Sequence, residues 1–139
     1  MADELIHKKE LVDAGLKNTR ARNAILHLLE IENRPVAVPE IIENLGEEGI
    51  GADQATVYRI LEKFLEKELV HRFEFQEGKF RYELAGEEHH HLICTNCGKI
   101  EDVSDCNLKE LEIEIRAKKG FLVKKHSLEF FGICNSCQH

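Results

Sequence analysis

The 139-residue chain lacks long apolar runs, an apolar N-terminal segment and an excess of basic residues. No stretch approaches the roughly 20 apolar residues of a membrane-spanning helix, which argues against a membrane protein. Residues 1–10 are charged and lack the apolar core of a signal peptide, so we expect a cytoplasmic protein. In that reducing compartment cysteines are expected to bind metal ions rather than form disulfides.

The charge distribution does not by itself favour nucleic-acid binding. The formal net charge is -7, with 12 Lys and Arg against 17 Asp and Glu in residues 1–84 and 7 against 9 in residues 85–139. A nucleic-acid-binding face would therefore need its cations gathered locally. The sequence contains no internal repeat and no low-complexity segment.

Four of the five cysteines form two C-x-x-C pairs, Cys94 with Cys97 and Cys134 with Cys137. This spacing is typical of a closed tetrahedral zinc site, in which one ion ties together two loops of a small domain. Four buried thiols without metal are the alternative. Three consecutive histidines at 89–91 precede the first pair and indicate a second metal site nearby.

The first half of the chain has the periodicity of helices, and the stretch after it has the alternation of strands. The expected helices are residues 5–16, 19–32, 38–45 and 53–65. The expected strands are residues 69–75 and 80–84. Helices followed by a β-hairpin predict a winged helix-turn-helix, in which the fourth helix is the recognition helix and the hairpin is the wing.

The second half is expected to form a small α/β unit with one antiparallel sheet. A polar hinge at 85–88 precedes it. Its expected elements are strands at 91–94 and 99–103, a helix at 108–118 and a last strand at 121–133. The predicted fold class is therefore α+β, an N-terminal winged helix-turn-helix followed by a small α/β domain with a four-cysteine zinc site.

Several stretches resemble the ferric uptake regulator (Fur) family of bacterial metal-dependent repressors. In the family's order they are Ala14–Thr19 with Arg22, Ala55–Arg59, Tyr82–Leu84, His89–Asp102, and His126–Leu128 leading to Gly132–Cys134. The resemblance implies a homodimer, with a DNA-binding domain at 1–84 and a dimerisation and metal-binding domain at 85–139. It implies a double-stranded DNA operator, expected to be an A·T-rich palindrome, and neither enzymatic activity nor a membrane partner.

The resemblance also implies a regulatory metal site whose ligands are Glu83, His89, His91 and Asp102. Two histidines separated by one residue on a strand point to the same face, so both can reach one ion. The mixture of nitrogen and oxygen donors suits Fe2+, Mn2+ or Zn2+.

Position 35 departs from the pattern of the iron- and peroxide-sensing members, which usually have a histidine there. This chain has Pro35, which cannot bind a metal. Zinc-sensing members often take an imidazole from the wing strand, where this chain has His71. His71 is therefore expected as a fifth ligand, and the alternative is an ordinary wing residue.

Many members have a further, optional metal site, which here would use His90 and His126. The family's helical carboxylate aligns with Lys109, so Glu110 is expected to supply the carboxylate instead. The alternatives are a surface His90 and a His126 that is hydrogen-bonded within the sheet.

For DNA binding, Tyr58 and Arg59 are expected on the recognition helix, where tyrosine can pack on thymine methyl groups and arginine can bind phosphate or guanine. Tyr58 could alternatively pack in the core. Contacts to phosphates and the minor groove are expected from Lys17, Thr19, Arg22 and Thr56. These cations must share one face to offset the acidic remainder of the domain.

The resulting functional prediction is a metal-responsive transcriptional repressor of metal-uptake genes, of the iron type by default, with a structural Zn2+. A zinc-uptake or peroxide regulator of the same family is the alternative: His71 favours zinc, and Asp102, where iron sensors usually have Glu, favours the peroxide branch. A zinc-dependent hydrolase is the alternative of a different class. The H-x-E and P-C-x-x-C pattern of zinc deaminases is absent.

Overall fold

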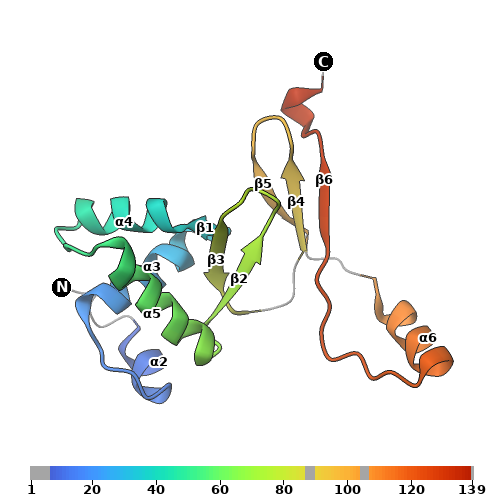
Figure 1. The fold of residues 1–139 in the computed structure, drawn as a ribbon, viewed down its shortest axis with the longest axis horizontal. Coiled ribbons are helices and arrows are strands. Elements are labelled where there is room, and N and C mark those ends of the chain that lie inside the picture. Colours follow the sequence, from blue (N-terminus) through green and yellow to red (C-terminus); the bar gives the residue numbers. More distant parts are fainter. Residues whose placement is uncertain (1–6, 87–89, 104–106, 139) are drawn as a thin grey trace. The chain divides into compact units, whose positions relative to one another are not determined.

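The computed structural model describes residues 7–86, 90–103 and 107–138. The chain divides into two compact units, Met1–Gly86 and Glu87–His139 (Figure 1). His89, a predicted regulatory ligand, and Cys106, the fifth cysteine, lie outside the described residues.

The described residues of the first unit form four helices and a three-stranded sheet. The helices are α2 (Lys8–Asp13), α3 (Arg20–Glu32), α4 (Val38–Glu47) and α5 (Gln54–Glu66). The strands are β1 (Val36–Ala37), β2 (Val70–Glu74) and β3 (Phe80–Leu84), in the order β1-β3-β2 with both pairings antiparallel. The winged helix-turn-helix predicted from the sequence is thus present, with the additional short strand β1.

Side-chain caps fix where two of these helices begin. The Thr19 hydroxyl accepts a hydrogen bond from the Arg22 backbone N–H at 3.2 Å, and α3 starts at Arg20, directly after Thr19. The Asp53 carboxylate accepts one from the Thr56 N–H at 2.8 Å at the start of α5. Such caps satisfy backbone donors that the helix leaves unpaired.

The apolar faces of α3, α4 and α5 meet in one core with the sheet. It includes Phe64 and Tyr82, both with an exposed fraction of 0 %. At its edge, Arg81 lies against the Glu77 carboxylate, with Nε and Nη2 at 2.9 and 3.0 Å from its two oxygens. These hydrogen bonds hold the pKa of Glu77 below its ordinary value.

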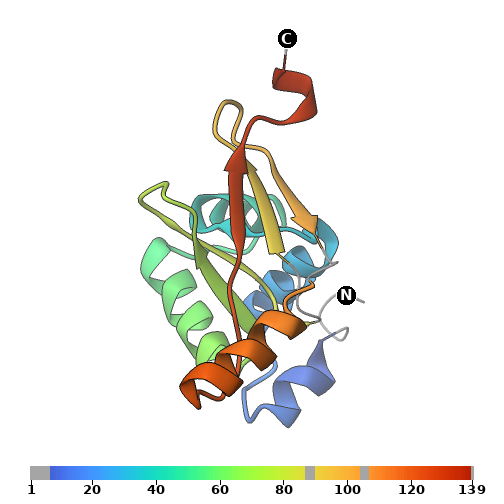
Figure 2. The ribbon, with the colours of Figure 1, turned by 90° about the vertical axis from the view of Figure 1, so that its right-hand side faces the viewer.

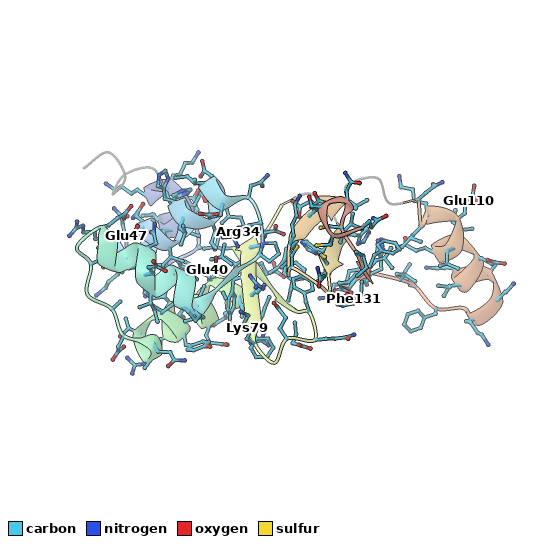
Figure 3. All side chains as sticks on the ribbon, turned by 90° about the horizontal axis from the view of Figure 1, so that it is seen from above. Arg34, Glu40, Glu47, Lys79, Glu110 and Phe131 are labelled. Carbon is cyan, nitrogen blue, oxygen red and sulfur yellow. The ribbon has the colours of Figure 1, made fainter. Side chains whose placement is uncertain are left out.

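A second ion pair lies next to Pro35. The Arg34 guanidinium donates to the Glu40 carboxylate at 2.7 Å, and both residues are labelled in Figure 3. Burial alone would raise the pKa of Glu40. The hydrogen bonds from Arg34 and from the Ala37 backbone outweigh burial, so the pKa of this carboxyl lies below its ordinary value. The Pro35 carbonyl oxygen accepts hydrogen bonds from Arg34 and Arg81.

The second unit has a three-stranded sheet of β4 (His90–Cys94), β5 (Ile100–Val103) and β6 (Glu129–Gly132), followed by the 3-10 turn η1 (Asn135–Cys137). β4 is central, antiparallel to β5 and parallel to β6 (Figure 2). The prediction of an antiparallel sheet was therefore wrong for β6. The expected strand at 121–133 is also reduced to four residues, since residues 120–128 have no regular secondary structure.

Helix α6 (Lys109–Lys119) stands clear of this sheet in Figures 1 and 2. None of its residues is buried. Large apolar side chains are exposed on the helix, on the connection after it and on β6, among them Ile113, Phe121 and Phe130. So much exposed apolar surface is typical of an interface with another protein chain.

Candidate metal centres and DNA-binding face

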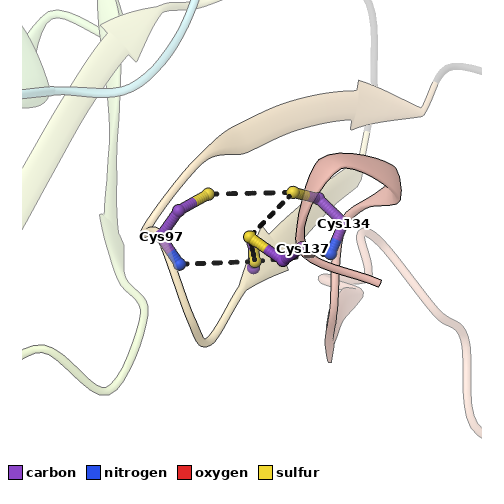
Figure 4. Close-up of side chains that lie close together, drawn as sticks. Cys97, Cys134 and Cys137 are labelled. Carbon is purple, nitrogen blue, oxygen red and sulfur yellow. Dashed lines mark hydrogen bonds between the residues drawn. The ribbon is translucent and has the colours of Figure 1, made fainter. Parts of the chain in front are cut away.

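The structure brings the four paired cysteines together at one end of the second sheet. The Sγ atoms lie 3.9 Å apart for Cys94 and Cys137, 3.7 Å for Cys97 and Cys134, and 3.5 Å for Cys134 and Cys137 (Figure 4). Four thiolates arranged tetrahedrally around zinc at about 2.3 Å would have sulfurs about 3.8 Å apart. The cysteine cage therefore matches the size and donor set of a closed zinc site.

Each loop of this cage is folded to aim its sulfurs inward. After β4 the chain reverses at Gly98, whose φ of 80° belongs to the left-handed region that glycine adopts without strain. After β6, Cys134 leads directly into the 3-10 turn that carries Cys137. Because β4 and β6 run parallel, both loops leave the same edge of the sheet.

The protonation of the thiols is strongly asymmetric. Hydrogen bonds from the backbone N–H groups of Cys97 and Cys134 lower the pKa of Cys94 to about 6. For Cys137, the Asn96 side chain lowers the pKa, but the neighbouring sulfurs, Cys134 first, raise it to about 11 overall. Without a cation, the cage thus favours a single deprotonated cysteine over several. Zinc must therefore displace protons from the other thiols as it binds.

In the second unit, His91 and Asp102 lie on adjacent strands. They are register partners of β4 and β5, and His91 Nε2 is 3.7 Å from a carboxylate oxygen of Asp102. The His91 side chain is buried, and Asp102 is exposed. Two of the predicted regulatory ligands are therefore neighbours, with one nitrogen and one oxygen donor.

In the first unit, the predicted ligands His71 and Glu83 are also register partners, on β2 and β3. Residues directly opposite each other in an antiparallel pair project from the same face of the sheet. Glu83 is buried and His71 is exposed. The two residues predicted on the wing are thus paired across its strands, with the carboxylate buried and the imidazole exposed.

His90 and His126, which were expected in the optional site, are neighbours, and the carboxylate beside them is not the expected one. His126 Nε2 is 3.2 Å from His90 Nε2, and His126 Nδ1 is 2.6 Å from a carboxylate oxygen of Glu112. Glu110, labelled in Figure 3, was expected in that place. Two residues along a helix are about 200° apart around its axis, so Glu110 and Glu112 cannot share a face. The structure therefore replaces Glu110 by Glu112 as the helical neighbour of His126.

The predicted DNA-binding residues lie at the starts of α3 and α5. A groove in the first unit is lined by side chains from both helices, namely Arg22, Thr56, Tyr58, Arg59, Ile60, Glu62, Lys63 and Glu66. Tyr58 is half-buried and packs against the core with part of its side chain. Tyr58 therefore packs partly against the core, as the alternative expected, and also lines an open groove.

Lys17 and Thr19 lie just before α3, next to this groove. The Arg22 guanidinium donates to the Lys17 carbonyl at 3.0 Å, which holds the loop against the helix. Lys17 and Arg59 are both exposed. Four of the six predicted DNA-binding residues line one groove, and the other two precede the helix beside it.

Comparison with known proteins identifies the family. Residues 13–131 match the model of the "Ferric uptake regulator family". The chain belongs to the ferric uptake regulator family. It is 40% identical over 126 residues to the "Ferric uptake regulation protein" of Escherichia coli strain K12, which covers 89% of this chain and 85% of that protein.

Solved structures of family members have the same fold. The ferric uptake regulator of Vibrio cholerae matches with a TM-score of 0.80 and 35% identity, over 92% of this chain and 99% of that one. The regulator from Francisella tularensis with iron matches with a TM-score of 0.78 and 30% identity, over 88% and 95%. These likenesses confirm the predicted α+β fold class and the resemblance to this family.

Family membership excludes the hydrolase alternative. Members of the ferric uptake regulator family are metal-responsive transcription regulators that bind DNA operators as dimers, and they are not enzymes. The exposed apolar side chains of the second unit agree with a dimer. In the part of the chain that the structure describes, no helix has the length and apolarity to cross a membrane.

Proposed function

We propose that this regulator is a cytoplasmic repressor of metal-uptake genes that responds to iron. The observation that carries the proposal is the neighbouring pair His91 and Asp102, a buried imidazole beside a carboxylate in the unit that the zinc cage closes. A nitrogen and an oxygen donor suit Fe2+, Mn2+ or Zn2+ better than the thiolate-seeking Cu+. The cysteine cage would hold a separate, structural Zn2+.

The proposed regulatory ligands are Glu83, His89, His91 and Asp102, with His71 as a fifth. His71 and Glu83 are paired opposite each other on the wing strands, which supports the proposal that both bind the regulatory metal. A bound cation would supply positive charge that holds these donors together. The cation would bind more tightly to the arrangement in which the two winged helices of a dimer fit the operator. Binding of the cation would therefore increase the population of that arrangement.

The His90, His126 and Glu112 cluster is proposed as a second, accessory metal site. The two Nε2 atoms face each other and could share one ion, while Glu112 lies on the other ring nitrogen of His126 and would orient that ligand. Occupancy there would tie α6 to the sheet, since Glu112 belongs to α6 and His90 to β4.

For the operator, we propose base contacts by Tyr58 and Arg59, and phosphate or minor-groove contacts by Lys17, Thr19, Arg22 and Thr56. The groove that most of these side chains line supports this division of roles. Because the domain as a whole is acidic, binding must depend on this local set of cations, and affinity should fall steeply as salt rises.

Fluorescence anisotropy with an A·T-rich palindrome and with random DNA of the same length tests the proposal. Under anaerobic conditions Fe2+ or Mn2+ should tighten binding to the palindrome, and His91→Ala should abolish that response. Lys99→Ala is the matched control in the same sheet region, because its side chain is exposed. Affinity for the palindrome that does not change with any of Fe2+, Mn2+ or Zn2+ would contradict the proposal.

A zinc-uptake regulator is the second candidate, and His71 is the observation that favours it. An imidazole opposite Glu83 offers zinc an extra nitrogen ligand at the wing. Activation by Zn2+ at concentrations where Fe2+ and Mn2+ have no effect, abolished by His71→Ala, would select this candidate.

A further inference from the structure

A buried histidine at the start of the first unit belongs to none of the sites above. His7 precedes α2, has an exposed fraction of 1 %, and donates its backbone N–H to the Asn23 side chain of α3 at 3.1 Å. Its ring nitrogens each face a carboxylate: Nδ1 is 3.0 Å from Glu10 and Nε2 is 3.0 Å from Glu30. Burying an imidazole between two helices with such neighbours calls for a chemical explanation.

The two contacts of the His7 ring differ in kind. Nδ1 lies within hydrogen-bond distance of Glu10, and a neutral ring that donates its Nδ1 proton to Glu10 keeps a lone pair on Nε2. Among the residues that the structure describes, neither His7 Nε2 nor the buried Nδ1 of His27 has a hydrogen-bond partner. The Glu30 oxygen is thus close to Nε2 but out of line for a hydrogen bond.

That spacing is the one expected of two ligands on a single cation. Ligand atoms about 2.0–2.1 Å from an ion, with a bond angle between 90° and 100°, lie about 3 Å from each other. The carboxylate on Nδ1 also fits, because a histidine that binds a metal usually donates its other ring N–H to a carboxylate.

His27 supplies a third donor. It precedes Glu30 by three residues on α3, so the two side chains lie on the same face of the helix. The His27 and His7 ring centroids are 6.2 Å apart with the rings tilted by 55°. The ligand atoms of His7, His27 and Glu30 are not all within 4.8 Å of one another, so the His27 ring would have to turn toward the other two to complete a site.

We propose that His7, His27 and Glu30 bind a divalent transition-metal cation of the Zn2+ class, with Glu10 as a positioning residue. Two imidazoles and one carboxylate are a donor set that zinc accepts while keeping a fourth position for water. The cation links the segment before α2 to the middle of α3, and so fastens the N-terminal helix to the winged helix.

Zinc uptake by the full-length protein, measured by equilibrium dialysis and elemental analysis, tests this site. Glu30→Gln should take up one Zn2+ per chain fewer than the parent, and it should fold normally because the Glu30 side chain is 54% exposed. Glu32→Gln, on the same helix with its side chain paired to Arg34, is the matched control and should equal the parent. Glu10→Gln should weaken this uptake about 10- to 100-fold, as expected for a residue that orients a ligand.

A second readout separates a bound metal from an ion pair. Zn2+ should raise the midpoint of thermal unfolding of the first unit more in the parent and in Glu32→Gln than in Glu30→Gln or His27→Gln. Equal zinc uptake by the parent and Glu30→Gln would overturn the proposal and leave His7 as an imidazolium bridging two carboxylates. Metal-activated DNA binding uses other residues and should be unchanged in Glu30→Gln, so failure of one proposal does not decide the other.

Discussion

Removing zinc from the cysteine cage should unfold the second unit and leave the first unit folded. Among the described residues of the second unit, Ile93 and Cys94 are the buried apolar side chains. Burying one isoleucine contributes about 1.5–3 kcal/mol, while a structural zinc contributes roughly 10–16 kcal/mol in small zinc domains. The ion is therefore the larger source of stability for this sheet. The described residues of the first unit include a core of seventeen buried apolar side chains, so this unit does not depend on the ion.

Cys97→Ser is the suitable perturbation, because the Cys97 side chain is exposed and its loss creates no cavity. The variant should purify without the cage zinc, lose the dimer in analytical ultracentrifugation, and keep the helical circular dichroism of the first unit. Cys106→Ser, which lies outside both C-x-x-C pairs, should bind zinc and dimerise like the parent. A zinc-free Cys97→Ser protein that remains a dimer with the parent's thermal transitions would refute the reasoning.

Three further predictions concern the first unit and its wing. Phe64→Ala should lower the free energy of unfolding by about 3–5 kcal/mol in urea titrations, because this ring is fully buried. The pKa of Glu77 is lowered by Arg81 in the folded state, so this carboxylate adds stability above its ordinary pKa of 4.5 that is lost as pH falls. Glu77→Gln should therefore flatten the acid side of the stability curve, and a slope equal to the parent's would contradict this. His71→Ala should reduce regulatory-metal affinity about as much as His91→Ala in metal titrations followed by DNA binding, and an unchanged response would make His71 an ordinary wing residue.

Much of the first unit follows from local sequence signals. Thr19 and Asp53 are helix caps that also act as such in the structure, and the apolar spacing after them identifies the buried faces of α3 and α5. The two C-x-x-C pairs likewise identify the cysteine cage, because each pair fixes its own loop. Signals of this kind depend on residues within about one helical turn of each other.

What the sequence did not reveal depends on contacts between distant segments. The two residues of β1 are too few to show alternation, and their pairing with β3 joins Val36 to Tyr82. The direction of β6 depends on how α6 and the connection after it return to the sheet. Glutamates alternate at 110, 112 and 114 on α6, so only the position of His126 determines which one it meets.

The parallel pairing of β4 and β6 has a consequence for chain entropy. A zinc cross-link from Cys94 to Cys137 closes a loop 43 residues long, and α6 lies inside that loop. Closing a flexible loop costs only about 0.6 kcal/mol more each time its length doubles. The stretch from α6 to β6 can therefore gain or lose several residues with little penalty to the cage. The limits on its length come instead from the contact of His126 with Glu112 and from the exposed apolar side chains of this stretch.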